Sequence, residues 1–279
     1  MLDAKPAAAP RGPQTHPRWI DALVLLATIA LSLAASWPLP AHLATHVPGR
    51  QADARVFQWN NWWVGRALLA PGGPQNPLYT DRFTYPTGAS LAGHNLNWIS
   101  SLLSVPLAGL VGPTAAYNLL FTLTLWGSGY AIYLLVRYVT GRRDAAFIAG
   151  LVFAFYPYHL SGNWDGQMNL ANTQWLPLAL LFLLRTVDHR RIRDALLCGF
   201  LIALAGLDCW FYLPFLGLWG LAWLPYSLIW ERHRWNGRLV GLLAGAALVS
   251  GLLVAPALWP LLAESGQETV SEAADYFAE

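Results

Sequence analysis

Asp53 is the first reactive group in a stretch that combines a carboxylate with arginines and tryptophans. The stretch is QADARVFQWNNWWVGRALL, residues 51–69, and its arginines are Arg55 and Arg66. A carboxylate can take a proton from an attacking hydroxyl as a general base, and an arginine can stabilise the charge of a phosphate. Asp53 also stands immediately before a helix expected to begin at Ala54, where it would cap the first N–H groups. The two roles are compatible, and both stay open.

The residues after Asp53 form two contrasting sides if they are helical. The apolar side comprises Val56, Phe57, Trp63, Val64, Ala67 and Leu68. The polar side comprises Arg55, Gln58, Asn61 and Arg66. Indole rings suit the headgroup layer of a bilayer. A helix with one apolar and one polar side is typical of helices that lie in the membrane interface. The stretch therefore predicts an interfacial amphipathic helix.

A second polar stretch, YPYHLSGNWDGQMNLANTQWLPL, covers residues 156–178 between two apolar runs. Its polar side chains are His159, Asn163, Asp165, Gln167, Asn169, Asn172 and Gln174. Polar groups at membrane depth normally face protein or a wet cavity, and this makes the stretch a candidate functional loop. The alternative is a solvated turn with ordinary helix caps.

Two smaller polar features accompany these loops. His94, Asn95 and Asn97 lie in YPTGASLAGHNLNW, residues 85–98. A single histidine is more often a structural group than a catalyst, and the neighbouring amides favour a site only modestly. Asp208, in LAGLDCWFYLPF, either lines the same cavity or caps a helix.

The composition indicates which solvent surrounds the chain. Of its 279 residues, 56% are hydrophobic and only 11% are charged, whereas about a quarter of the residues in a soluble protein are charged. The net charge of +2 argues against nucleic acid as a partner. Cys198 and Cys209 lie inside apolar runs without a His or Cys at metal-ligand spacing, and we interpret them as packing residues.

Several apolar runs approach the length of about 20 residues that a membrane-crossing helix needs. They are residues 20–38, 114–139, 145–160, 170–187, 195–211, 212–230 and 239–262. The basic clusters between them are GRRD (141–144), DHRRIRD (188–194) and ERHRWNGR (231–238). Because each cluster is two crossings from the next, the positive-inside rule places all three in the cytoplasm with the N-terminal tail, residues 1–18. The outer segments are then loops 39–97 and 161–169, the Asp208 corner and the tail from Glu264.

One further apolar segment, residues 98–111, does not fit this count. An even number of crossings must separate the N-terminus from GRRD, and runs 20–38 and 114–139 already supply two. The segment has fourteen residues and contains Pro106, so it is short for a crossing helix. It predicts a re-entrant or interfacial helix on the outer side.

The order of these features resembles the GT-C integral-membrane glycosyltransferases, which include protein O-mannosyltransferases and lipid A aminoarabinose transferases. In related bacterial chains the first loop follows the pattern D-x-x-x-F-x-x-W-x-x-x-W, and N-P-L, P-x-G and Y-x-x-x-P-Y come later. Here the matching segments are DARVFQWNNWW, NPLY, YPTG and FAFYPYHLSGNWDGQMNLANTQWLPL. The resemblance extends over residues 19–262. It departs at Gly166-Gln167, where related chains often have Gly-His.

The resemblance implies an all-α fold: a polytopic transmembrane helix bundle whose large outer first loop, residues 39–97, carries the amphipathic helix. It also implies inverting transfer of a sugar from a polyprenyl-phosphate carrier to a lipid, glycan or protein acceptor, at the outer face of a bacterial cytoplasmic membrane. Asp53 would be the base and Asp165 an orienting acid, while an arginine would stabilise the leaving phosphate. The expected substrate-binding residues are Arg55, Arg66, Arg82, His94, Asn95, Asn97, His159, Gln167, Asn169 and Asp208. No cofactor is certain, and a divalent metal ion stays open.

Two other classes of membrane protein stay open. A transporter or lipid flippase would also have many crossing helices and polar groups at membrane depth, although no internal repeat is visible. A noncatalytic membrane protein would use its aromatic residues only as anchors. We expect residues 19–262 to form the transmembrane domain and residues 263–279 an outer tail that is cut short.

Overall fold

Helices make up nearly all the regular structure of the computed structural model, which describes residues 19–49, 53–164 and 166–278. The longer helices are α1 (Trp19–Ala35), α2 (Asp53–Leu68), α3 (Trp98–Val111), α4 (Pro113–Thr140), α5 (Arg143–Ala154), α8 (Trp175–His189), α9 (Ile192–Asp208), α10 (Tyr212–Trp230) and α11 (Gly237–Ala278). The shorter ones are η1 (Leu39–Ala41), α6 (Pro157–Trp164), α7 (Met168–Ala171) and η2 (Arg232–Arg234). A hairpin pairs β1 (Tyr79–Thr80) antiparallel with β2 (Ala89–Ser90). The predicted all-α class is confirmed.

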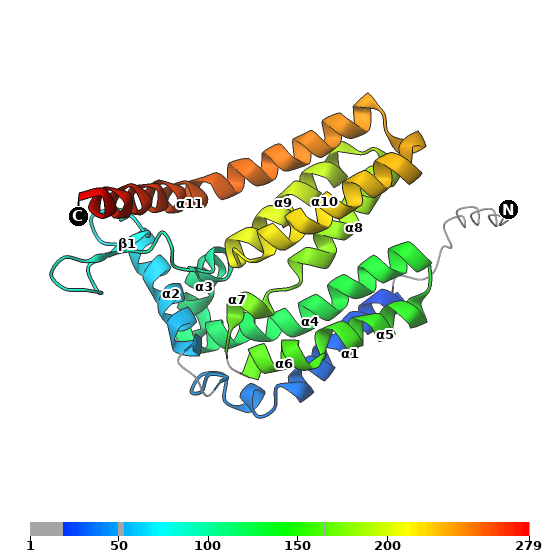
Figure 1. Ribbon diagram of the computed structural model, residues 1–279. Helices are drawn as coiled ribbons and strands as arrows, with labels where there is room; N and C mark the ends of the chain where they lie inside the picture. The colour runs from blue at the N-terminus through cyan, green and yellow to red at the C-terminus, as the bar shows by residue number, and fades with distance from the viewer. Residues whose placement is uncertain (1–18, 50–52, 165, 279) are drawn as a thin grey trace.

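α4 joins two groups of helices (Figure 1). It packs along α1 and α5 on one side, and it contacts α8, which packs in turn with α9, on the other. Small residues let these helices approach closely, as is common in membranes. A Cβ atom at Gly150 would lie 2.6 Å from the carbonyl oxygen of Gly129, and one at Gly199 would clash with the backbone of Ala246. These glycines therefore set the α4–α5 and α9–α11 crossings.

The described residues contain four helical segments that are long and apolar enough to cross a membrane. They are Pro113–Thr140, Met168–His189, Tyr212–Trp230 and Gly237–Glu264. α10 and the crossing part of α11 are apolar yet bury little of their surface inside the protein. An apolar helix with so few protein neighbours is typical of one surrounded by lipid. The fold is thus that of a membrane protein.

The predicted run 145–160 is wrong as a single crossing helix. α5 ends at Ala154 and α6 begins at Pro157, because the residue before a proline is disfavoured in the helical region. At twelve residues, α5 is about 18 Å long, which is shorter than a hydrocarbon core of about 30 Å. Runs 170–187 and 239–262 fall within the crossing segments Met168–His189 and Gly237–Glu264, although residues 172–174 separate α7 from α8 and α11 continues unbroken to Ala278.

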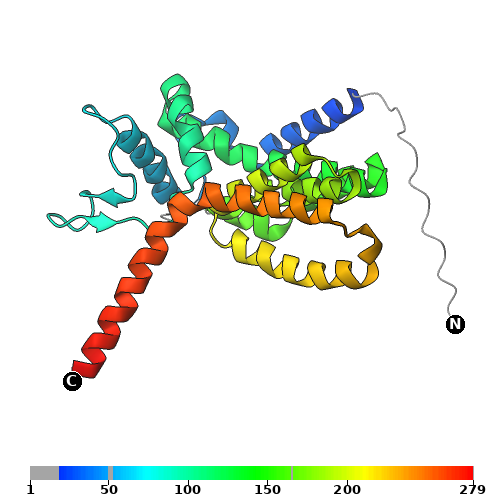
Figure 2. The same ribbon diagram turned by 90° about the horizontal axis from the view of Figure 1, so that it is seen from above.

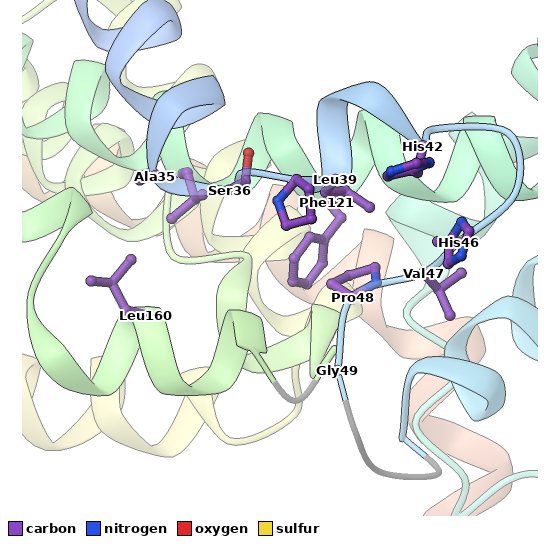
Figure 3. A pocket seen from close by; sticks show the side chains of 12 residues that line it. Ala35, Ser36, Leu39, His42, His46, Val47, Pro48, Gly49, Phe121 and Leu160 are labelled. Atoms are coloured by element: carbon purple, nitrogen blue, oxygen red, sulfur yellow. The ribbon is translucent and has the colours of Figure 1, made fainter.

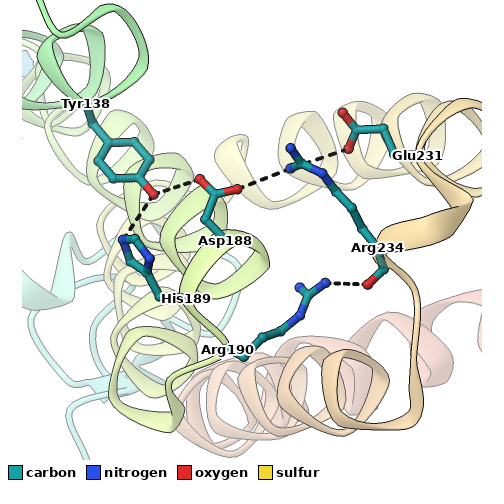
Figure 4. Close-up of polar contacts among 6 residues, drawn as sticks. All are labelled: Tyr138, Asp188, His189, Arg190, Glu231 and Arg234. Atoms are coloured by element: carbon teal, nitrogen blue, oxygen red, sulfur yellow. Dashed lines mark hydrogen bonds and ion pairs between the residues drawn. The ribbon is translucent and has the colours of Figure 1, made fainter. Parts of the chain in front are cut away.

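The three basic clusters and the start of α1 lie together at one end of the bundle. Asp21 of α1 pairs with Arg143, 3.2 Å away, and Asp188 accepts a hydrogen bond from Tyr138 at 2.7 Å. Asp188 also pairs with Arg234 at 3.2 Å, so that these contacts join α4, α8 and η2 (Figure 4). This common end agrees with the predicted topology, in which the clusters share one side. Its assignment to the cytoplasm stays a prediction.

The loop between α2 and α3 lies at the opposite end, beside α11 (Figure 2). Ser90 of β2 donates to the carboxylate of Glu264, with oxygen–oxygen distances of 2.6 and 2.8 Å. The predicted outer loop and the end of the last crossing segment are therefore neighbours, and we call this the outer end of the bundle after that prediction. No helix boundary separates residue 262 from residue 263.

Both ends of α3 lie at this same outer end. The amide of Ser100, in its first turn, bonds to Asp208 at the outer end of α9, with a nitrogen–oxygen distance of 3.0 Å. At its other end only Gly112, with a φ of 87°, separates it from α4. This geometry agrees with the prediction that residues 98–111 enter and leave on one side.

We predict that cysteines at the two ends of the bundle differ in their access to reagents. Gln75 is exposed in the outer loop, and Gly237 begins α11 with open space around it. An impermeant thiol reagent added to intact cells should label Gln75→Cys directly and Gly237→Cys only after permeabilisation. The native Cys198 and Cys209 are buried, so the parent protein serves as the unlabelled control. Labelling in the reverse order would invert the membrane orientation.

Candidate functional site

Three outer segments meet at Gly166, and we call this meeting point the glycine junction. Gly166 has a φ of 73°, and a Cβ atom there would lie 2.5 Å from the Cβ of Ala54 and 2.9 Å from the carbonyl oxygen of Pro48. The chain after α1, the start of α2 and the loop after α6 are thus in direct contact. Only glycine combines this positive φ with so little space.

α4 supplies the polar anchors of the glycine junction. The hydroxyl of Tyr117 donates to the carbonyl of Gly166 at 2.8 Å, and the amide of Asn118 donates to the carbonyls of Leu43 and His46 at 2.7 and 2.6 Å. Tyr117 and Asn118 are fully buried. An apolar cluster beneath them comprises Leu39, Ala54, Phe57, Tyr117, Leu120, Phe121, Met168 and Ala171. The outer segments are therefore held by the core of the bundle.

Asp53 and Gln167 flank the glycine junction and bind each other. Nε2 of Gln167 donates to Oδ2 of Asp53 at 2.7 Å. We expected Asp53 to cap a helix that begins at Ala54, but Asp53 is itself the first residue of α2. Helix boundaries shift by one residue in this way because terminal turns fray. A carboxylate in the first turn is still stabilised by the helix dipole. The bond brings together the two loops that the sequence marked as functional.

Asp165, the other predicted catalytic acid, lies outside the described residues. Asn169 is half-buried in α7, two positions after Gln167. His159 is buried, and its ring nitrogens lie 2.9 Å from the carbonyl of Ala154 and 3.0 Å from that of Ala171. It thus joins the end of α5 to α7. These contacts are structural, and the substrate-binding role of His159 stays a prediction.

A small apolar cavity adjoins the glycine junction, and we call it the histidine cavity (Figure 3). It has a volume of about 230 Å³ and is lined mainly by apolar side chains and by two histidines. They include Leu39, Phe121, Leu125, Leu160, His42 and His46. The two imidazole rings lie 4.8 Å apart. Sequence reasoning missed them, although a spacing of four residues is a recognisable signal.

The cluster around His94 ties the outer loop to α2. Nε2 of His94 lies 2.7 Å from Oδ1 of Asn60, and the amide of Asn60 donates to the carbonyl of Asn95 at 2.9 Å. Burial lowers the pKa of His94, because it disfavours the charged imidazolium. Asn97 precedes α3 with a left-handed φ of 54° and is fully buried. These residues shape the loop, and the structure does not place them beside Asp53.

Asp208 is a helix cap. It is fully buried, and its two oxygens accept hydrogen bonds from the amide of Ser100 at 3.0 Å and from the indole of Trp175 at 2.8 Å. Asn172 donates to the hydroxyl of Ser100 at 2.9 Å and completes the group. Of the two roles predicted for Asp208, the cap is therefore the one observed, and the capped helix is α3.

The predicted grouping of Arg66 and Arg82 with Asp53 is wrong. Thirteen residues separate Asp53 from Arg66, about 20 Å along α2, and the helical rotation turns the two side chains to different sides. Arg66 and Arg82 instead line a second cavity, between α2 and α3. Arg55 is exposed and lies in the first turn of α2, two residues after Asp53.

The buried side of α2 also differs from the predicted apolar side. It comprises Ala54, Phe57, Asn60, Trp63, Val64 and Ala67. Val56 is 38% exposed, because the rotation of the helix turns it away from α3 and α4. Asn60 takes its place among the buried residues because His94 and Asn95 satisfy its amide.

Comparison with known proteins leaves the class of the chain open. No family model and no curated protein matches it. Within the described residues, no group of three or more His, Cys, Asp or Glu side chains is arranged to hold a metal ion. The site must therefore be argued from its own geometry.

We predict that Gly166→Ala destabilises the protein by about 2 kcal/mol or more. A left-handed conformation costs a non-glycine residue about 1–2 kcal/mol, and a methyl group at this contact adds overpacking. Gly220→Ala in α10, where the space is open, is the matched control. Thermal unfolding in detergent should show a lower midpoint for Gly166→Ala alone, and equal midpoints would disprove the tight junction.

We predict that His94 makes stability depend on pH. Because burial lowers its pKa in the folded protein, the unfolded chain binds more protons, and stability is lost as pH falls below the usual histidine pKa of about 6.5. His94→Gln can still donate to Asn60 and should have a shallower loss. Unfolding midpoints measured between about pH 8 and pH 5 test this, and parallel curves for parent and variant would contradict it.

Proposed function

We propose that the protein is a membrane glycosyltransferase that moves a sugar from a polyprenyl-phosphate carrier to an acceptor at the membrane surface. The observation that carries the proposal is the bond from Gln167 to Asp53. It fixes a carboxylate at the glycine junction, which the histidine cavity adjoins. A lipid-linked donor needs this combination of a polar reacting group and an apolar approach.

Asp53 is suited to act as the general base. Its side chain is partly exposed, and the amide of Gln167 holds Oδ2 while Oδ1 can receive a proton. A carboxylate with a fixed orientation meets the acceptor hydroxyl without first reorganising, and this lowers the barrier of the transfer step. Gln167 stands where related sequences often carry histidine, and an amide serves here as an orienting donor.

The histidine cavity is suited to the lipid part of the donor. Its walls from α1, α4 and α6 are apolar, and His42 and His46 provide ring nitrogens near the glycine junction. Together with Arg55 they are cationic or hydrogen-bonding groups that, among the described residues, could contact a donor phosphate near Asp53. Arg66 and Arg82 are too distant for this role.

The proposed reaction is a direct displacement at the anomeric carbon. The acceptor oxygen forms a bond to that carbon as the bond from the carbon to the phosphate oxygen breaks. Asp53 takes the proton of the acceptor, and the polyprenyl phosphate leaves with the bonding electrons. Attack from the side opposite the phosphate inverts the configuration of the sugar.

A transporter or lipid flippase, or a noncatalytic membrane protein, is the competing class. The buried polar group at the start of α3 argues against a transport pathway there. Asp208 and Asn172 both bind Ser100, so these polar side chains hold helices together. Incubation of the purified protein with labelled polyprenyl-phosphate sugars and a membrane extract separates the classes. Release of free polyprenyl phosphate supports the transferase, and movement of the labelled lipid across liposomes without cleavage supports the flippase.

We predict that Asp53→Asn reduces the transfer rate about 10²- to 10⁴-fold, the usual contribution of a general base. Asparagine keeps the size and polarity of the side chain but cannot accept the proton, so insertion and thermal stability should stay near those of the parent. Asp81→Asn is the matched control, because Asp81 is an exposed acid of the same outer loop. Transfer at the parent rate by Asp53→Asn would exclude Asp53 as the base.

A further inference from the structure

A second cavity, which we call the arginine groove, lies between α2 and α3, and the proposed transfer does not use it. Its volume is about 770 Å³. Its walls combine guanidinium, indole and hydroxyl groups with apolar side chains, and they include Arg66, Arg82, Trp59, Trp62, Asn61 and Ser104. The groove thus offers cations and aromatic rings in one concave site.

The two guanidinium groups are available to an anion. Arg66 makes no ion pair within the part of the chain that the structure describes. Arg82 lies 3.4 Å from Asp81, but both side chains are more than half exposed, and such surface pairs contribute little. Arginine binds phosphate oxygens with two parallel hydrogen bonds. The groove is therefore suited to a phosphate group.

One wall of the arginine groove is a fixed aromatic stack. Trp59 lies parallel to Trp63, with ring centroids 5.8 Å apart, and it stacks on Phe83 at 4.7 Å. The indole of Trp63 donates to the carbonyl of Pro77 at 2.9 Å, which anchors the stack to the outer loop. Indole rings favour the headgroup layer of a bilayer. The stack therefore suits the boundary between lipid headgroups and acyl chains.

The groove also has apolar walls. Val105 and Ala108 of α3 line it, and so does Leu69, which follows α2 and is 71% exposed. Acyl chains can pack on these side chains along α3 while the headgroup stays in the groove.

We propose that the arginine groove binds the phosphate headgroup of an anionic membrane phospholipid, with its acyl chains along α3. A polyprenyl-phosphate donor is the less suitable occupant, because about 20 Å along α2 separate Arg66 from Asp53. A phosphate held by Arg66 is therefore not the leaving group at a sugar that touches Asp53. The inference does not depend on the proposed transferase.

Native mass spectrometry of the delipidated protein tests the proposal. The protein is titrated with dioleoyl phosphatidylglycerol, dioleoyl phosphatidylcholine or undecaprenyl phosphate. Arg66→Gln and Arg82→Gln should each weaken phosphatidylglycerol binding about tenfold, as expected for the loss of charge-assisted hydrogen bonds. Phosphatidylcholine, which has no net charge, should bind weakly to every variant.

Arg238→Gln is the control, because Arg238 is an exposed arginine at the start of α11 that does not line the groove. Its phosphatidylglycerol binding should equal that of the parent, and unchanged unfolding midpoints should show that all three variants fold. Equal weakening by all three substitutions would mean nonspecific charge attraction and would overturn the proposal. Loss of undecaprenyl phosphate binding alone would also overturn it, by assigning the groove to the donor, whereas transfer activity tests Asp53 separately.

Discussion

A helix that begins inside a membrane protein needs acceptors for its first N–H groups, and α3 receives one from a distant carboxylate. Asp208 binds the amide of Ser100 and the indole of Trp175, so α3, α8 and α9 meet at one fully buried acid. α2 packs on α3, and α3 continues into α4 through a single glycine. The position of α3, and with it the arginine groove between α2 and α3, therefore depends on this capping group.

Local patterns predicted the helices well where the local sequence decides the structure. The expected segments 98–111 and 212–230 agree with α3 and α10, because apolar length and bounding polar residues determine both. The run 145–160 failed because average hydropathy does not register the conformational restriction before Pro157. The exposure of Val56 was missed because a helical wheel does not say which neighbours a helix will have.

The candidate site was predictable only where residues close in sequence define it. Asp53 and the loop that contains Gln167 stood out as polar groups beside apolar runs, and their hydrogen bond places the two together. Arg66 was grouped with Asp53 because the two are close in sequence, whereas the rise and rotation of α2 separate them. His42 and His46 lie in a segment without periodicity, and only the packing of that segment on Asn118 brings them to a cavity.

The cap of α3 also has a consequence for how the protein is made. Asp208 lies 108 residues beyond Ser100 in the chain, and Trp175 also follows α4. During synthesis, α3 and α4 leave the ribosome well before the acid that satisfies the start of α3. Until α9 has been inserted, the first turn of α3 lacks this acceptor. The contacts that fix the start of α3 therefore form only after the first crossing helices are in place.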